Sequence, residues 1–231
     1  MPTTMNSTLK FLGKKFGVDV NQKGPINLPT ADRLMMAQTL RELGVKRGVE
    51  VGVAQGWHSL ILCENLPEVE LYGVDVWDLY GGYNEYTDRI HKYYLEAQER
   101  MKPYPNYHFI KKFSMDAVKD FPDRSLDFVY IDGAHDFKNV ADDLCEWSKK
   151  VRIGGIVYGH DYKRRHQRWI VDVKDVVDAY SYDKRVRPLF LLNVPVLRKE
   201  GGLSWMFVRQ EMDLVNYQYV LTKDGYKEIY G

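Results

Sequence analysis

The sequence has few cysteines, almost no excess of charge and no long apolar run, and each shortage excludes a class of protein. Its two cysteines, Cys63 and Cys145, lack the spacing of metal ligands, which predicts free thiols in a reduced compartment. A formal net charge of +1 gives no general argument for nucleic acid or an acidic membrane as partner. No apolar run approaches the ~20 residues that cross a bilayer, and residues 1–18 contain no apolar core of a signal peptide. These absences predict a cytoplasmic globular protein with no membrane partner.

Short β-branched segments alternate with amphipathic segments along most of the chain, and Gly or Pro marks many of the boundaries. The alternation predicts an α/β fold, with a doubly wound, mostly parallel seven-stranded sheet whose last strand is antiparallel. We expect strands at 48–53, 70–76, 107–110, 126–131, 156–159, 188–192 and 204–209. We expect helices at 30–43, 57–65, 87–101, 114–121, 138–151 and 169–180.

No repeat or clear linker divides the chain. We expect an N-terminal extension at 1–29, one domain at 30–210 and an unassigned tail at 211–231, for which a homodimer contact and simple packing both fit. Thr30 is the expected N-cap of the first helix, and Gly44 its C-cap. Three tryptophans are expected in the core: Trp57, Trp147 and Trp169.

Glycines and an acidic side chain follow the first two expected strands. In open α/β sheets, ligands bind beyond the carboxyl ends of the strands. Gly52 and Gly56 would let the backbone approach a ligand closely, and the helix N-terminus after them favours a carboxylate or phosphate. Asp75 lies about 20 residues further on, where a carboxylate can accept hydrogen bonds from ribose hydroxyls. The spacing G-x-x-x-G lacks the third glycine of the dinucleotide fingerprint, which argues against NAD.

Two further strands also end in polar residues. The fourth is followed by Asp132-Gly-Ala-His135, and the fifth by His160-Asp161-Tyr162. With Glu50-x-Gly-x-x-x-Gly and Asp75, these motifs resemble class I S-adenosylmethionine-dependent methyltransferases. The resemblance covers about residues 30–210, and lies nearest the branch that holds small-molecule and sugar O-methyltransferases.

The resemblance implies a role for each matched position. The turn from Gly52 to Gly56, with Val53, would pass under the methionine part of the cofactor, and Glu50 would hold that turn or reach the amino-acid end. The ribose and adenine would meet the positions after the second and third strands, namely Asp75, Val76, Ser114 and Met115. Asp132 and His135 would lie near the sulfonium and the acceptor.

The implied reaction needs a base and an aligned acceptor, because the cofactor already supplies a strong electrophile. His160 is the first candidate for the base and His135 the second, with Asp132 beside them. In metal-dependent relatives, carboxylates at these strand ends hold Mg²⁺, and Asp132 and Asp161 occupy comparable places. Because His160-Asp161 stands where catechol-type enzymes have Asp-Asn, weak or no dependence on Mg²⁺ is an equal expectation.

Structural readings remain open for several of these residues. The glycines fit any tight turn, Asp75 and Asp132 could cap helices, and the histidines could form structural hydrogen bonds. The basic run at 163–168 is either a solvated surface or a region that attracts an anionic acceptor. The Tyr-rich segment at 77–83 is either a lid over the acceptor or an ordinary surface loop.

The sequence therefore predicts methyl transfer from S-adenosylmethionine to a small hydroxylated acceptor, anionic or sugar-like. Three other functions stay open: a non-catalytic cofactor-binding scaffold, an NAD-dependent oxidoreductase and an RNA methyltransferase. Only the basic run supports the last of these, so a nucleic-acid partner is not expected.

Overall fold

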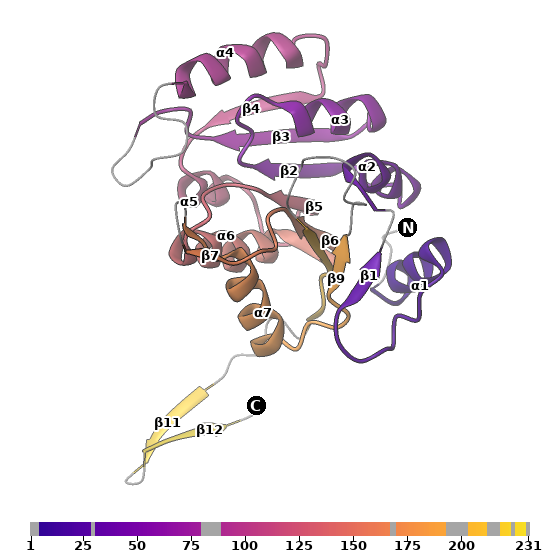
Figure 1. The fold of residues 1–231 in the computed structure, drawn as a ribbon, viewed down its shortest axis with the longest axis vertical. Coiled ribbons are helices and arrows are strands. Elements are labelled where there is room, and N and C mark those ends of the chain that lie inside the picture. The colour runs from indigo at the N-terminus through magenta and orange to yellow at the C-terminus, as the bar shows by residue number, and fades with distance from the viewer. Residues whose placement is uncertain are drawn as a thin grey trace.

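A single sheet of eight strands organises the chain (Figure 1). The computed structural model describes residues 5–28, 31–79, 89–166, 170–192, 203–211, 218–222 and 225–229. The strand order is β1-β9-β10-β6-β5-β2-β3-β4, and only β10 runs antiparallel to its neighbours. The bounds are β1 Ile26–Leu28, β2 Arg47–Val51, β3 Glu70–Asp75, β4 Tyr107–Lys111, β5 Leu126–Ile131, β6 Val151–Gly159, β9 Phe190–Leu192 and β10 Ser204–Val208.

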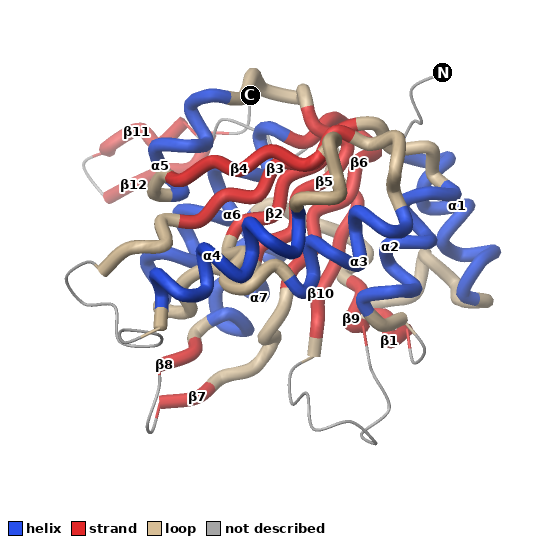
Figure 2. Tube along the Cα trace, turned by 90° about the horizontal axis from the view of Figure 1, so that it is seen from above, coloured by secondary structure: helices blue, strands red, loops and turns tan. Residues whose placement is uncertain are grey.

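Helices cover both faces of this sheet. One face packs against α1 Met5–Phe16, α2 Arg33–Glu42, α3 Trp57–Asn65 and α4 Ile90–Met101. The other packs against α5 Ser114–Ala117, the 3-10 turn η1 Val118–Asp120, α6 Phe137–Lys150 and α7 Val173–Asp183. In Figure 2, α1–α4 lie in front of the strands while α6 and α7 lie behind them. In the described part of the chain, no helix combines the length and apolarity needed to span a membrane.

Strand β5 shows why the sheet is buried on both sides. Phe128 and Tyr130 point into the core under α1–α4, whereas Val129 and Ile131 point into the core under α6 and α7. Side chains alternate between the two faces of a strand, so a strand without polar interior positions belongs in the middle of a doubly covered sheet.

The predicted architecture is confirmed, with one more strand than expected. β1 adds to the edge of the sheet by pairing parallel with β9. The antiparallel pairing of the last strand is as predicted, since β10 lies between β6 and β9. The predicted ranges of β5 and α3 match their observed bounds.

Several local predictions were wrong. Helix α2 begins at Arg33, because the Asp32 side chain accepts a hydrogen bond from the Met35 amide, while Thr30 lies outside the described residues. Strand β6 begins at Val151 and runs through the two glycines that were expected to precede it. Helix α7 begins at Val173, after β8 Ile170–Val171, which pairs with β7 Arg165–His166.

The tryptophans divide into three outcomes. Trp147 is fully buried, as predicted. Trp57 is 57% exposed instead of in the core, because it stands at the first turn of α3 and packs against the Arg100 guanidinium. Trp169 lies outside the described residues.

The two ends of the chain differ in their contacts. In α1, Leu12 is buried in the core, and the Thr8 hydroxyl donates a 2.8 Å hydrogen bond to the Gly154 carbonyl. Near the C-terminus, β11 Gln218–Thr222 pairs antiparallel with β12 Gly225–Ile229. The division of the chain into extension, domain and tail stays a prediction.

Candidate active site

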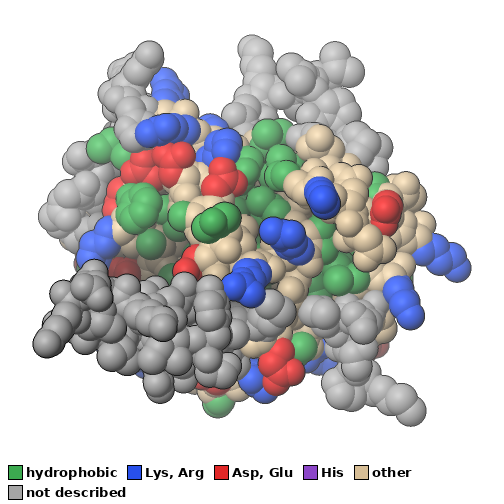
Figure 3. All heavy atoms as spheres, turned by 90° about the horizontal axis from the view of Figure 1, so that it is seen from below, with side chains coloured by type: hydrophobic (Ala, Val, Ile, Leu, Met, Phe, Trp, Pro, Cys, Tyr) green, Lys and Arg blue, Asp and Glu red, His purple; other side chains and the backbone are tan. Residues whose placement is uncertain are grey.

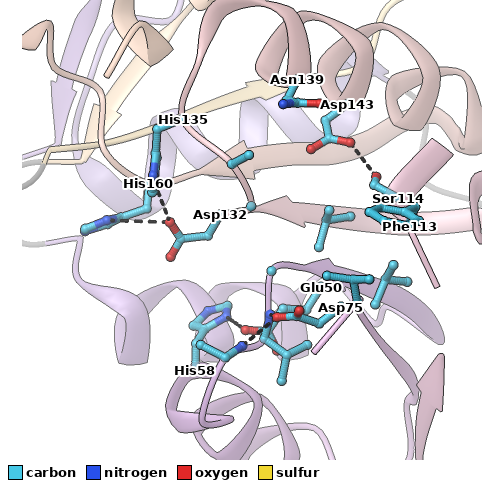
Figure 4. Close-up of a pocket in the computed structure, with 18 of the residues that line it drawn as sticks. Glu50, His58, Asp75, Phe113, Ser114, Asp132, His135, Asn139, Asp143 and His160 are labelled. Carbon is cyan, nitrogen blue, oxygen red and sulfur yellow. Dashed lines mark hydrogen bonds and ion pairs between the residues drawn. The ribbon is translucent and has the colours of Figure 1, made fainter. Parts of the chain in front are cut away.

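A cavity of about 740 Å³ opens at the carboxyl ends of β2, β3, β5 and β6 (Figure 4). Its wall combines backbone turns that follow these strands with side chains from α2, α3 and α6. The predicted site residues that line it are Glu50, Gly52, Val53, Asp75, Val76, Ser114, Met115, Asp132, His135, His160 and Asp161. Gly56, the other predicted residue, lies just outside the lining as the N-cap of α3.

The turn after β2 passes tightly against the turn after β5. Gly52 has a φ of +87°, and a Cβ there would lie 2.0 Å from the carbonyl oxygen of Asp132. A side chain is therefore excluded both by backbone conformation and by space. Gly56 also has a positive φ, of +77°, where the turn enters α3. Both glycines are needed for the shape of this turn.

The Asp75 side chain stabilises this turn by accepting hydrogen bonds from its backbone amides. Its Oδ2 accepts hydrogen bonds from the amides of Val53 (3.0 Å) and Ala54 (2.9 Å), and its Oδ1 accepts one from the Trp77 amide (3.0 Å). Burial raises the pKa of the Asp75 carboxyl, and the backbone donors offset part of that rise. Each carboxylate oxygen offers two lone pairs, so Oδ1 keeps capacity for one more donor.

Trp77 also holds this turn in place, whereas the sequence analysis considered it only as part of the segment 77–83. Its indole Nε1 donates a 2.8 Å hydrogen bond to the Ala54 carbonyl, and its ring packs against Tyr94 and Phe109. Ala54 and Trp77 both have positive φ angles, of 48° and 41°. Non-glycine residues adopt this conformation at a cost, and such strain gathers at functional sites.

Glu50 lies beneath the turn, where its buried carboxyl group contacts other buried polar side chains. One of its oxygens accepts a hydrogen bond from the Ser59 hydroxyl, and the other lies 3.2 Å from Nδ1 of His58. The Ser59 hydroxyl also lies 3.0 Å from that of Tyr107. His58 is 4% exposed and lines the cavity, and its Nε2 has no hydrogen-bond partner among the described residues. A ligand group could satisfy this nitrogen.

Two histidines and two carboxylates gather where β5 and β6 end. Nε2 of His135 lies 3.1 Å from Asp161 and 3.7 Å from Asp132, and Nδ1 of His160 lies 3.3 Å from Asp161. Asp161, which has a φ of +53°, also accepts a 2.6 Å hydrogen bond from Lys163. We call these four residues, Asp132, His135, His160 and Asp161, the histidine–carboxylate cluster.

Positive partners keep both carboxylates of the cluster ionised. Burial raises the pKa of Asp132, but hydrogen bonding from His135, the nearby imidazole of His160 and the charge of Arg33 outweigh it and hold the pKa below its usual value. Arg33 donates to Asp132 over 3.3 Å, and the Tyr130 hydroxyl does so over 3.0 Å. Burial likewise raises the pKa of Asp161, and its histidine and lysine donors lower it far more.

The cluster also offers ligands of the kind that bind metal ions. Asp132, His135 and Asp161 each present one ligand atom, and these atoms lie within 4.8 Å of one another. Two carboxylates and an imidazole suit divalent cations. This set contains the two predicted carboxylates and adds His135.

The opposite end of the cavity is built by α5 and α6. The Ser114 hydroxyl donates to Oδ1 of Asp143 and accepts a 2.8 Å hydrogen bond from the Trp147 indole. Met115 and Val76 line the cavity nearby. Burial raises the pKa of Asp143 to about 7, although the Ser114 hydroxyl lowers it somewhat.

Sequence reasoning did not single out Arg33, His58 and Asp143, which also line the cavity. A signal for Asp143 was present, since an acid at this position shares the helical face of Val140, Leu144 and Trp147. His58 had a weaker one, its position in the first turn after the glycine loop. Of the Tyr-rich segment 77–83, residues 80–83 lie outside the described part, so the proposed lid stays a prediction.

The basic run after β6 turns partly toward this site. Lys163 pairs with Asp161 of the cluster, whereas Arg164 pairs with Asp175 over 3.0 Å on the surface. The end of the run, residues 167–168, lies outside the described residues.

A family model described as a methyltransferase domain matches residues 49–162, which include the turn after β2 and the cluster. In sequence, the chain is 25% identical over 166 residues to an uncharacterized protein of Sinorhizobium fredii (strain NBRC 101917 / NGR234). That match covers 69% of this chain and only 17% of the relative, so the chain spans a small part of that protein's length.

Solved methyltransferases share the fold. An O-methyltransferase from Bacillus cereus in complex with SAH has a TM-score of 0.58 and 13% identity, over 87% of this chain and 90% of that one. The O-methyltransferase TomG from Streptomyces achromogenes, in complex with SAM, has a TM-score of 0.55 and 13% identity, over 88% and 90%. An rRNA methylase from Streptococcus thermophilus has a TM-score of 0.54 and 12% identity, over 78% and 98%. The fold alone therefore does not select the acceptor. Residues 49–162 therefore match a methyltransferase domain, and the chain shares the fold of O-methyltransferases solved in complex with SAH or SAM.

Proposed function

We propose that the protein transfers the methyl group of S-adenosylmethionine to a hydroxyl group of a small molecule. One observation carries the proposal: a single cavity joins the tight glycine turn held by Asp75 to the histidine–carboxylate cluster. A cofactor seated on the turn would present its methyl group toward the cluster, where a base is available.

The residues present suit this cofactor. The absent side chain at Gly52 lets the turns after β2 and β5 pack together at the wall of the cavity, where the methionine part would lie. Among the described residues, buried Nε2 of His58 has no hydrogen-bond partner and could meet this part of the cofactor. Glu50 keeps His58 and the turn in place, and Asp75 would accept a ribose hydroxyl on the capacity left at Oδ1. Val76, Ser114 and Met115 would surround the adenine.

Bound S-adenosylmethionine supplies an electrophilic methyl group, so the protein's part is to orient the acceptor and remove its proton. His160 fits the role of base. Its Nδ1 faces Asp161, an ionised carboxylate that would accept a hydrogen bond from an Nδ1–H group. That hydrogen bond favours the tautomer whose free lone pair is on Nε2. Among the described residues, Nε2 of His160 has no such partner. His135 is the second candidate, with its own Nε2 directed to Asp161.

The cluster would also steady the charge that this proton transfer creates. A proton taken by His160 leaves an imidazolium beside Asp161 and Asp132, both of which are already ionised. A positioned base contributes roughly 10²–10⁴-fold to the rate. Alignment of the acceptor contributes up to about 7–11 kcal/mol in favourable cases.

A divalent cation such as Mg²⁺ would be held by Asp132, His135 and Asp161. When bound, it would orient acceptor oxygens and lower the pKa of an acceptor hydroxyl. Arg33 and Lys163 already offset the two carboxylates, which favours weak dependence on a metal. We expect EDTA to leave the methylation rate nearly unchanged, and abolition of the rate by EDTA with recovery on adding Mg²⁺ would contradict this expectation.

The test is a panel of acceptors incubated with S-adenosylmethionine and the purified protein, with S-adenosylhomocysteine formation as the readout. Catechols, sugars and hydroxy acids represent flat, polyhydroxylated and anionic classes. We expect release of S-adenosylhomocysteine with at least one class and a methyl ether in the product. A methyl group found only on nitrogen or carbon would contradict O-methylation.

Methylation of RNA is the second candidate in principle, since one fold relative is named as an rRNA methylase. On the face shown in Figure 3, however, Lys and Arg side chains are interspersed with Asp and Glu across the described residues. A basic stripe is the usual footprint of RNA binding. RNA in the same panel, at two salt concentrations, separates the two candidates.

A further inference from the structure

A buried carboxyl group lies at the end of the cavity that the proposed reaction leaves unused. Asp143 belongs to α6, is 4% exposed and lines the cavity with Ser114 and Met115. Buried carboxyl groups are rare unless they have partners or a function. No lysine, arginine or histidine pairs with Asp143 among the described residues, in contrast to Asp132 and Asp161.

The hydrogen bonds around Ser114 decide which group can meet a ligand. An indole N–H only donates, so the Ser114 oxygen accepts from Trp147. The one hydroxyl proton of Ser114 is then committed to Oδ1 of Asp143. Ser114 therefore has no proton left for a ligand, and its hydroxyl orients the carboxyl group of Asp143.

The second oxygen of Asp143 remains available. No hydrogen bond to Oδ2 occurs among the described residues, and a Cβ at Gly133 would lie 3.4 Å from it. Gly133 also lines the cavity, so the lack of a side chain there leaves room beside Oδ2. In Figure 4, Asp143 and Ser114 face the cavity from the side opposite Glu50 and Asp75.

Resting on the function proposed above, we propose that Asp143 recognises the adenine ring by accepting a hydrogen bond from its exocyclic amino group. An acceptor-only carboxylate suits an N–H donor and disfavours the carbonyl oxygen that a 6-oxopurine carries in the same place. Burial raises the pKa of Asp143, and the nearby acids Asp142 of α6 and Asp136, the N-cap of that helix, add to the rise. A hydrogen bond from a ligand N–H group would stabilise the ionised form of this buried carboxyl group.

Asp143 would thus set the specificity for adenine in the cofactor. A buried polar group left without its partner, or opposed by a like group, costs enough to separate two such ligands at least tenfold. The carboxyl group would act on binding of the cofactor base, far from the proton transfer at His160.

The test compares two ligands on three proteins by calorimetric titration at about pH 8.5, above the pKa of about 7 of the Asp143 carboxyl group, so that this group is ionised. The ligands are S-adenosylhomocysteine and its 6-oxo analogue S-inosylhomocysteine, and the proteins are the wild type, Asp143→Asn and Glu146→Gln. Glu146 lies one turn further along α6, is outside the cavity lining and loses the same charge in its variant. Thermal melting checks that each protein is folded.

We expect the wild type and Glu146→Gln to prefer S-adenosylhomocysteine by at least about tenfold. In Asp143→Asn the preference should shrink to within about threefold or reverse, since an amide can donate to the 6-oxo group. An unchanged preference in folded Asp143→Asn would overturn the inference and leave the cofactor site intact. Failure of the wild type to bind either ligand would overturn the proposed function itself, and the inference with it.

Discussion

The two ends of the cavity treat buried carboxyl groups in opposite ways. At the histidine–carboxylate cluster, Asp132 and Asp161 face Arg33, Lys163 and two histidines, and their pKa values lie below the usual range. At the other end, the partners of Asp75 and Asp143 among the described residues are backbone amides and a hydroxyl, and the pKa values of these two carboxyl groups lie above the usual range. The residue type is the same, and only the partners differ.

The difference in partners indicates which end of the cavity can accept hydrogen bonds from a ligand. Carboxylates that already have positive partners are electrostatically satisfied, so they can hold histidines in place during a proton transfer. Carboxyl groups with only neutral donors retain acceptor capacity that a ligand with N–H or O–H groups can use. This comparison supports our proposal that proton transfer takes place at the cluster and that Asp75 and Asp143 recognise the nucleoside.

The largest expected effect follows from removing the proposed base. His160→Asn should lower kcat by about 10²–10⁴-fold for an acceptor identified in the panel, because a positioned base is lost. Binding of S-adenosylhomocysteine should stay unchanged, since His160 is at the other end of the cavity. His91→Asn, at an exposed site on α4, is the matched control and should keep full activity. A kcat for His160→Asn within about threefold of the wild type would move the base to His135.

A smaller effect is expected on stability when the cluster loses a charge. Asp161→Asn should lower the free energy of unfolding by about 1–3 kcal/mol at pH 7.5, because donors to a charged, mostly buried group lose their partner. Asn tolerates the positive φ at this position, so backbone strain does not complicate the result. Asp123→Asn, which removes an exposed partner of Lys150, should change stability little. Urea denaturation of the three proteins measures both differences.

In contrast to Asp161→Asn, the substitution Asp143→Asn is expected to raise the free energy of unfolding. The pKa of Asp143 is about 7 in the folded protein and close to the ordinary value of 3.8 for an aspartate when the chain is unfolded. Between these values the unfolded chain releases a proton that the folded chain keeps, so wild-type stability falls as pH rises from about 4 to about 7. The variant lacks this loss and should be more stable than the wild type by about 1–4 kcal/mol above pH 7. Urea denaturation from pH 4 to 8 measures this; a variant less stable than the wild type at pH 8 would assign Asp143 a structural role.

Much of the fold could be predicted from the sequence, because apolar runs and glycine boundaries report burial directly. Strand β5 and helix α3 are examples. The edge strand β1 could not be predicted, since three residues are too short for a periodic pattern and Ile26 pairs with Phe190, far along the chain. Trp57 was misplaced because a large apolar side chain alone does not tell the core from the wall of a site.

The candidate site was predictable where residues follow strand ends, and less so elsewhere. Topology brings Glu50, Asp75, Asp132 and His160 together once the strands are known. Arg33, His58 and Asp143 reach the cavity from helices, and their positions depend on packing that the sequence pattern does not specify. The partners that set the pKa of Asp143 likewise become visible only in three dimensions.

The central claim is that the cavity binds S-adenosylmethionine through the turn held by Asp75. Its most direct test is calorimetric titration of S-adenosylhomocysteine into the wild type and Asp75→Ala, with circular dichroism to show that both are folded. We predict binding in the micromolar range by the wild type and loss of binding in the variant, whose turn loses three backbone hydrogen bonds. Absence of binding by the folded wild type would contradict the account and favour a scaffold or an oxidoreductase.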